Sequence, residues 1–143
     1  MTICTLIYSS RLSADPAGIV ESILDAAQRN NPSLSLTGAL VFDHRSFIQL
    51  LEGRRSTVTN MLLRIAADPR HTDLGIIHVD DVPKRRFPEW SMHHAAMRGK
   101  SLASVRAFMP DLEFEPADLT SEGAIALFDE LSLMASVPVP GPA

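Results

Sequence analysis

Two apolar stretches with only four polar residues between them constrain the fold of this chain most. Residues 36–42 (LTGALVF) and 47–51 (FIQLL) are almost wholly apolar, and residues 43–46 (DHRS) separate them. Short apolar stretches joined by a polar turn are typical of a β-hairpin, and continuous apolar character indicates strands that are buried on both faces. The sequence therefore predicts a sheet that contains a largely buried hairpin.

Apolar and β-branched patterns on both sides of the hairpin predict further strands and helices. In chain order, we expect a strand at 2–9, a helix at 15–30, the hairpin, a helix between Gly53 and Pro69, a strand at 74–79, a basic turn at 82–87 and a strand at 90–96. This order is βαββαβ with one added strand. It predicts an α+β fold, namely a ferredoxin-like βαββαββ sandwich in which two helices cover one face of a five-stranded sheet.

The chain changes character after Arg98. In order, the patterns predict a short helix at 101–109, an acidic connector at 112–120 and an amphipathic helix with Ala124, Leu127, Phe128 and Leu131 on one face. The last seven residues contain three prolines. We therefore expect one domain at residues 1–98 and a C-terminal helical extension with a flexible tail at residues 99–143.

Composition and charge narrow the classes of function. The chain has 143 residues, of which 45% are hydrophobic and 21% charged, the profile of one globular domain. The net charge of -4 argues against a nucleic-acid partner. No apolar run approaches the roughly 20 residues of a membrane helix, and the first residues lack the pattern of a signal peptide. We expect a cytoplasmic protein that binds neither nucleic acid nor membrane.

Gln49 is the only polar residue of the stretch 47–51, so it is expected to be buried whichever way it points. A buried carboxamide without hydrogen-bond partners costs about 1–3 kcal/mol. Tyr8, the only tyrosine, ends the first predicted strand, which lies beside the third strand in a ferredoxin-like sheet. The phenol is thus within reach of Gln49, although a pair that only stabilises the core would explain both residues as well.

Amide and basic side chains are further candidates for a ligand site. Asn30 and Asn31 lie at the C-terminal end of the first predicted helix and could present donors and acceptors to a flat heterocycle, or could simply end the helix. Arg64, Arg70 and His71 lie on or just after the second predicted helix. They could contact a phosphate, or form an ordinary solvated cluster.

Taken together, the separated motifs resemble those of the BLUF family of blue-light sensors that use FAD. The segments that carry the resemblance are Tyr8, Asn31, 36–40 (LTGAL), 47–49 (FIQ), 51–53 (LEG), 68–71 (DPRH), 85–87 (RRF) and 90–92 (WSM). They cover roughly residues 2–96 in order and without large gaps. Residues 1–98 are then expected to form a BLUF flavin-binding domain.

The resemblance implies a non-covalently bound flavin, FAD with FMN as the alternative. The isoalloxazine ring would lie between the two helices, with Ile23 and Ile65 as apolar walls and Asn30 near the ring. Asn31 would hydrogen-bond the carbonyl and imide edge of the ring, and Gln49 would bridge the N5/O4 edge and the Tyr8 hydroxyl. The basic residues placed near the ribityl-phosphate part are Arg64, Arg70 and His71.

The resemblance also implies a photoswitch made of Tyr8, Gln49, Trp90 and Met92. A photoexcited flavin is a strong oxidant and a phenol is readily oxidised, so Tyr8 would give up an electron and then a proton through Gln49. A carboxamide has a donor end and an acceptor end, so rotation or tautomerisation of Gln49 would exchange one hydrogen-bond pattern for another. Trp90 and Met92 lie on the strand that family members use to pass the change outward, although a strand pair at this spacing is also typical of core.

Two other classes of function stay open. One is a small ferredoxin-like enzyme, either an acylphosphatase-like hydrolase or a flavin-dependent redox enzyme. For the hydrolase, Arg54 and Arg55 are the only candidate anion cradle. The other is a cofactor-free dimerisation module. The five histidines are too scattered for a metal site, and no catalytic domain is expected after Arg98. A sensor without enzymatic activity would then act on an unidentified downstream protein or through self-association as a homo-oligomer.

Overall fold

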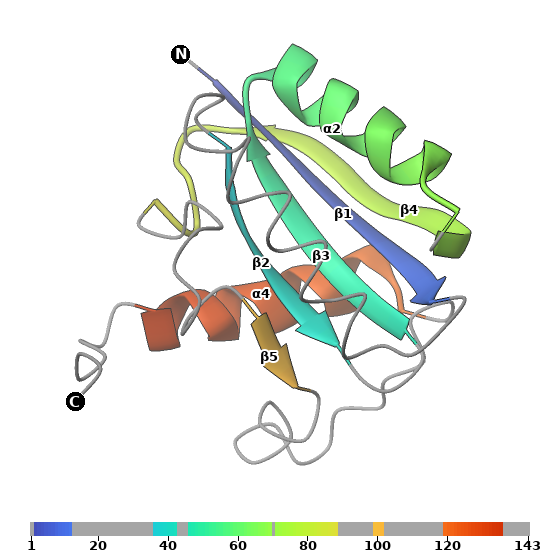
Figure 1. Ribbon diagram of the computed structural model, residues 1–143. Helices are drawn as coiled ribbons and strands as arrows, with labels where there is room; N and C mark the ends of the chain where they lie inside the picture. Colours follow the sequence, from blue (N-terminus) through green and yellow to red (C-terminus); the bar gives the residue numbers. More distant parts are fainter. Residues whose placement is uncertain are drawn as a thin grey trace, which may run out of the picture.

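A computed structural model describes residues 2–12, 36–42, 46–69, 71–88, 99–101 and 119–135. The described strands are β1 (Ile3–Leu12), β2 (Thr37–Phe42), β3 (Ser46–Gly53), β4 (His71–Val82) and β5 (Gly99–Ser101). The described helices are α2 (Arg55–Ala67) and α4 (Ser121–Ala135) (Figure 1).

The strands form one sheet in the order β4-β1-β3-β2-β5. The four longer strands are antiparallel to their neighbours, and β5 pairs in parallel with β2. The predicted hairpin is present as β2 and β3, in a register that sets Leu40 opposite Gln49. Gly38 lets these two strands approach, because a Cβ there would overlap the main-chain oxygen of Leu50. The α+β class and the antiparallel sheet are confirmed.

Three elements differ clearly from the sequence prediction. β1 covers Ile3–Leu12 instead of 2–9 and β4 covers His71–Val82 instead of 74–79, because the two strands pair with each other over almost their whole length. The short helix predicted from Ser101 is wrong at its first residue, which lies in β5, where main-chain pairing with β2 outweighs the local pattern. The predicted helix at 15–30 and the predicted strand at 90–96 lie outside the described residues.

Side chains on the two faces of the sheet form separate apolar clusters. On one face, buried residues of β1, β2 and β3 pack beneath α2. On the other face, Ile7, Leu50 and their neighbours pack against Phe87 and α4. Figure 1 shows α2 running along the sheet and α4 crossing it. The C-terminal helix therefore shares a core with the sheet.

Each described helix packs on the sheet through an apolar face that its own sequence pattern predicts. Val58 of α2 is buried, and Met61, Leu62 and Ile65 are partly buried against the same cluster, which is the stripe expected of a helix on a sheet. α2 ends at Ala67, and its C-cap Asp68 is extended because α geometry is disfavoured at the residue before Pro69. In α4, the predicted apolar face is buried, namely Ala124, Leu127, Phe128 and Leu131. Neither described helix is long and apolar enough to cross a membrane.

Candidate functional site

A buried hydrogen bond joins the two central strands of the sheet. Tyr8 of β1 and Gln49 of β3 are direct partners in the antiparallel register, so their side chains point to the same face. The Tyr8 hydroxyl donates a hydrogen bond to Gln49 Oε1. Tyr8 is 0% and Gln49 2% exposed. The contact predicted from the strand order is therefore present, deep in the core.

The surroundings of this pair are apolar. The buried cluster that includes Tyr8 is completed by Cys4, Leu6, Leu36, Leu40, Leu51 and Val58. Burial raises the pKa of the Tyr8 phenol far above its usual range near 10, because the tyrosinate would lose its hydration. The phenol is therefore neutral at physiological pH. A neutral donor therefore meets a neutral acceptor among buried apolar side chains.

The carboxamide of Gln49 has two chemically different ends. Its oxygen accepts the hydrogen bond from Tyr8, and its nitrogen carries two N–H donors. Exchanging the two ends would reverse the pattern, because the nitrogen cannot accept the phenol proton. The pair can thus exist in two hydrogen-bonded arrangements of the same atoms.

The other predicted site residues are placed unevenly. Ile65 is partly buried and packs against the cluster around Tyr8, as an apolar wall would. Arg64 is exposed in the last turn of α2. The main chain of His71 begins β4 opposite Leu12, and its side chain is not described. The remaining predicted site residues lie outside the described ranges: Ile23, Asn30, Asn31, Arg70, Trp90 and Met92.

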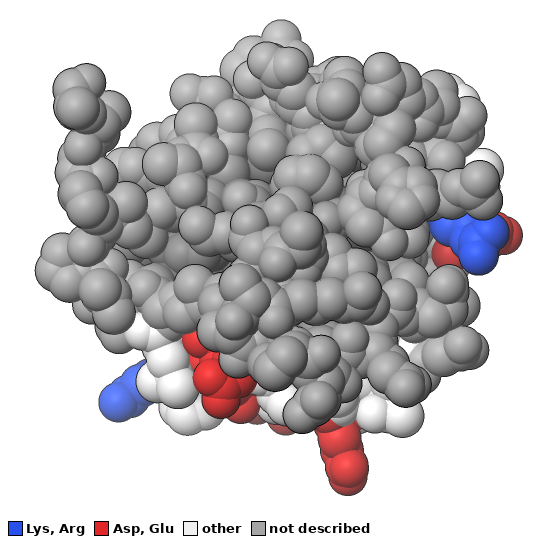
Figure 2. All heavy atoms as spheres, turned by 90° about the horizontal axis from the view of Figure 1, so that it is seen from below, with Lys and Arg blue, Asp and Glu red and all other residues white. Residues whose placement is uncertain are grey.

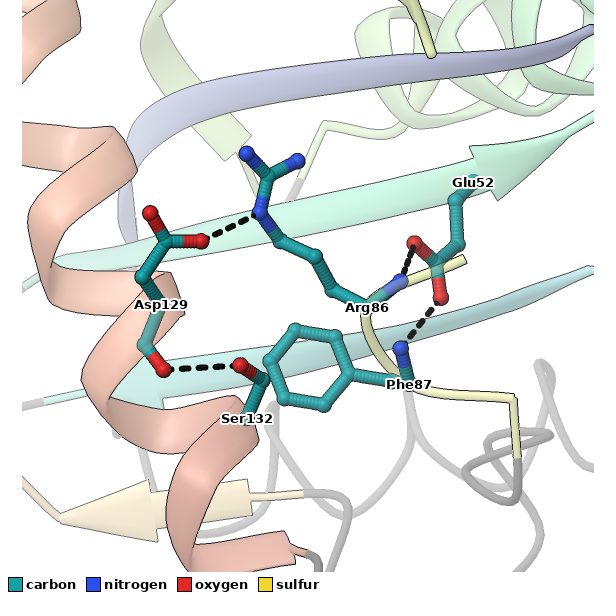
Figure 3. A network of polar contacts seen from close by, with 5 residues as sticks. All are labelled: Glu52, Arg86, Phe87, Asp129 and Ser132. Carbon is teal, nitrogen blue, oxygen red and sulfur yellow. Dashed lines mark hydrogen bonds and ion pairs between the residues drawn. The ribbon is translucent and has the colours of Figure 1, made fainter. Parts of the chain in front are cut away.

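The opposite face of the sheet holds a buried carboxylate that sequence reasoning missed. Glu52 of β3 is 0% exposed. Its Oε1 accepts hydrogen bonds from Thr37 Oγ1 at 2.9 Å and from the main-chain N–H of Phe87 at 2.7 Å. Its Oε2 accepts from the main-chain N–H of Arg86 at 2.8 Å (Figure 3). Both carboxylate oxygens are therefore satisfied, as burial of this group requires.

Arg85 closes the same arrangement from the side. Its Nη1 donates to Thr37 Oγ1 at 2.8 Å and to the main-chain oxygen of Glu52 at 3.0 Å. The Thr37 hydroxyl accepts from Arg85 while it donates to Glu52. We call this set of contacts, made by Glu52, Thr37, Arg85 and the main chain of residues 86–87, the Glu52 clamp. It fixes the segment after β4 to the β2–β3 hairpin.

The residues held by the clamp also contact α4. Arg86 Nε lies 2.7 Å from Asp129 Oδ1, and the side chains are 21% and 55% exposed. The Phe87 and Phe128 rings meet edge to face, with centroids 6.3 Å apart and planes at 86°. Figure 3 shows the Arg86–Asp129 ion pair and the Phe87 ring beside Glu52. The segment 86–87 therefore bridges β3 and α4.

A sequence signal for Glu52 did exist. Ile48, Leu50 and Glu52 alternate along β3, so a period of two places the carboxylate on the same buried face as the two apolar residues. The basic pair Arg85 and Arg86 does not reveal its partners, because the carboxylate accepts from main-chain N–H groups of residues 86–87 and not from a guanidinium group. The alternation was hidden because the whole stretch is apolar on both faces.

The described residues offer little support for the hydrolase alternative. Arg55 Nη2 forms an exposed ion pair with Asp81 Oδ2 at 2.7 Å, so this arginine already has a carboxylate partner. Among the described residues, no group of three His, Cys, Asp or Glu is placed to hold a metal ion. Figure 2 shows the described basic side chains at separate places rather than in one continuous patch on that face.

Known proteins share both the sequence pattern and the fold. The BLUF family model, described as sensors of blue-light using FAD, matches residues 3–93. Photoactivated adenylate cyclase subunit beta of Euglena longa is 35% identical over 96 residues, which are 66% of this chain and 11% of that protein. The blue light- and temperature-regulated antirepressor BluF of Escherichia coli (strain K12) is 37% identical over 89 residues, 62% of this chain and 22% of that protein. This chain thus spans only a small part of these relatives.

A solved structure extends the likeness to nearly the whole chain. The dark state structure of BlrB, a BLUF protein, has a TM-score of 0.79 and 34% sequence identity, and the match covers 95% of this chain and 98% of that chain. The family match covers well over half of the residues, and it includes both Tyr8 and Gln49. This chain belongs to the BLUF family of flavin-using blue-light sensors.

Proposed function

We propose that the chain binds FAD non-covalently and signals through a light-driven rearrangement of the Tyr8–Gln49 hydrogen bond. The observation that carries the proposal is this bond itself, a neutral and fully buried phenol–carboxamide contact between the two central strands. Both residues lie within the segment that matches the family model. FAD is proposed rather than FMN because the family is described by it.

The described residues fit a flavin. With Gln49 Oε1 occupied by Tyr8, the N–H donors of the carboxamide are the end that suits a ring carbonyl. Ile65 offers an apolar surface beside the same cluster. In the proposal, the ring lies between α2 and the helix predicted at residues 15–30. The residues proposed to complete the site are Ile23, Asn30 and Asn31 at the ring, and Arg64, Arg70 and His71 near the ribityl-phosphate part.

A bound flavin supplies the absorption of blue light and, once excited, a strong oxidant. Tyr8 would give an electron to the excited ring and its hydroxyl proton to Gln49, because that proton already points at Gln49 Oε1. Gln49 would then rotate or tautomerise, which exchanges its donor and acceptor ends. The electron and the proton would return to Tyr8 as the ring relaxes, so the two states would differ in their hydrogen bonds and not in redox level. The apolar side chains around the pair offer no competing hydrogen bond to either arrangement.

The output is proposed to act on another protein or on a second copy of this chain. The relatives join BLUF sequence to different outputs, since one is a cyclase subunit and another an antirepressor. In this chain, residues 1–98 would hold the flavin, and residues 99–143 would carry the signal, with Trp90 and Met92 on the strand between.

An absorption spectrum of the purified protein before and after blue light tests the proposal. We expect a yellow protein whose flavin bands shift slightly to the red in light and return in the dark, because a changed hydrogen bond perturbs the ring without reducing it. Acid should release intact FAD, identified by chromatography. Release of FMN would correct the cofactor, whereas colourless protein that takes up no added flavin would refute the sensor.

The variant Gln49→Leu tests the switch residue. Leucine has a similar volume and removes both ends of the hydrogen-bond bridge, so flavin should stay bound and the red shift should be lost. Ile48→Val, one residue away on the opposite face, is the matched control and should keep the shift. A normal shift in Gln49→Leu would assign the switch to another residue.

A further inference from the structure

One strand carries both polar sites of the sheet. Gln49 and Glu52 are three residues apart on β3, and their side chains point to opposite faces. At about 3.3 Å per residue, the two positions are about 10 Å apart along the strand. A change in how Gln49 is held therefore acts on the same short piece of backbone that positions Glu52.

The Glu52 clamp links residues 86–87 to the backbone of β3, so a shift of that backbone changes their position. Its carboxylate accepts three hydrogen bonds of 2.7–2.9 Å, and two of the donors are main-chain N–H groups of residues 86–87. Short bonds to a carboxylate are strong and directional, and a buried carboxylate cannot exchange them for water. Residues 86–87 must therefore move with Glu52 or lose their acceptor.

Residues 86–87 in turn contact α4 through two side chains. Arg86 reaches Asp129 at 2.7 Å, and Phe87 packs on Phe128. A cavity of about 450 Å³ lies between residues 82–86 and the α4 residues Asp129 and Ser132, beside this ion pair. A shift of residues 86–87 thus changes both the position of α4 and the shape of a surface cavity.

We propose that Glu52 is a positioning residue that couples the Tyr8–Gln49 pair to α4 across the sheet, with the Arg86–Asp129 ion pair as the last contact. The proposal rests on the proposed light-driven function. It adds a route through β3 and the segment after β4, on the face opposite the flavin. The output is a displacement of α4 relative to the sheet.

A nitroxide label on α4 provides the readout. Leu133 is 65% exposed on α4, and Leu133→Cys gives one accessible thiol. Cys4, the only natural cysteine, is buried, and its burial together with Asp81 raises the pKa of its thiol, so it stays unlabelled. In the full-length flavoprotein, we expect a reversible light-minus-dark difference in the label spectrum alongside the red shift.

Two variants in this labelled parent test the coupling. Arg86→Gln removes the contact with Asp129 but keeps the main-chain N–H that Glu52 accepts, so the red shift should stay and the label difference should be lost. Arg86→Lys keeps a cation and should restore part of the difference. Arg55→Gln, which removes an ion pair on the α2 side, is the matched control and should leave both signals unchanged. An unchanged label difference in Arg86→Gln would overturn the proposal.

Glu52→Gln extends the test to the clamp itself. It replaces one acceptor oxygen with an amide donor, so the red shift should stay and the label difference should be lost. If this variant fails to fold, Arg86→Gln still decides, because its side chain is at the surface end of the network. A labelled parent without any red shift would refute the proposed function, whereas a red shift without a label response would refute the coupling alone.

Discussion

Beneath α2, Tyr8 and Gln49 share one neutral hydrogen bond among apolar side chains, whereas on the α4 face the Glu52 carboxylate accepts three hydrogen bonds from two segments of the chain. A neutral bond between two side chains contributes about 1 kcal/mol net, so the pair can exchange arrangements at small cost. On the α4 face, each buried donor that loses the Glu52 carboxylate as its acceptor costs about 1–3 kcal/mol. The face with Tyr8 and Gln49 is therefore suited to a change of hydrogen bonding, and the face with Glu52 is suited to keeping its geometry.

The largest effect should come from Glu52→Ala. Removal of the carboxylate leaves the N–H groups of Arg86 and Phe87 without their acceptor, and at about 1–3 kcal/mol for each group we expect a loss of about 2–6 kcal/mol in the free energy of unfolding. Urea denaturation followed by circular dichroism measures it. A loss below about 1 kcal/mol would show that the two faces do not differ in the way described.

Alkaline pH should lower the stability of the protein through Tyr8, the buried phenol on the α2 face. Because burial raises the folded-state pKa of Tyr8, its contribution to stability is complete below the unfolded-state pKa of about 10 and falls as pH rises above it. The expected slope is about 1.4 kcal/mol per pH unit. Unfolding free energies measured at several pH values should show this slope in the parent but not in Tyr8→Phe, since no other tyrosine is present. Equal slopes would mean that the phenol ionises in the fold.

Near neutral pH, Tyr8→Phe should have the smallest effect on stability of the three. It removes one hydroxyl and keeps the ring packing, so we expect a loss of about 1 kcal/mol, with flavin still bound. Phenylalanine is harder to oxidise and has no acidic proton, so the reversible red shift should disappear. Denaturation and light-minus-dark absorption measure the two parts. An unchanged shift would return Tyr8 to the role of a core residue.

The sequence was sufficient to predict contacts and buried faces where the local pattern agrees with the strand order. The contact between Tyr8 and Gln49 could be predicted because the first and third strands are neighbours in a ferredoxin-like sheet, and because a buried polar side chain needs a partner. The buried face of α4 could be predicted from residues three and four apart, such as Ala124 and Leu127.

Long-range pairing explains what the sequence could not provide. β5 forms at Gly99–Ser101 because these residues pair with β2 on the side away from β3. No pattern within residues 99–109 predicts this pairing. The Glu52 clamp draws its donors from Thr37 and residues 85–87, which are 15 and more than 30 positions away. Only the folded sheet brings these donors to one carboxylate.

Thr5, which lies beside the Glu52 clamp, is a position where a substitution should stabilise the protein. Its side chain is buried on β1 directly opposite Glu52, and among the described residues its hydroxyl is the one buried side-chain polar atom without a hydrogen-bond partner. A buried hydroxyl without a partner lowers stability by about 1–3 kcal/mol, so valine at this position should make the protein more resistant to heat. Thr5→Val is therefore a starting point for engineering a more robust light-sensing module, because it leaves the phenol and the carboxamide on the other face untouched.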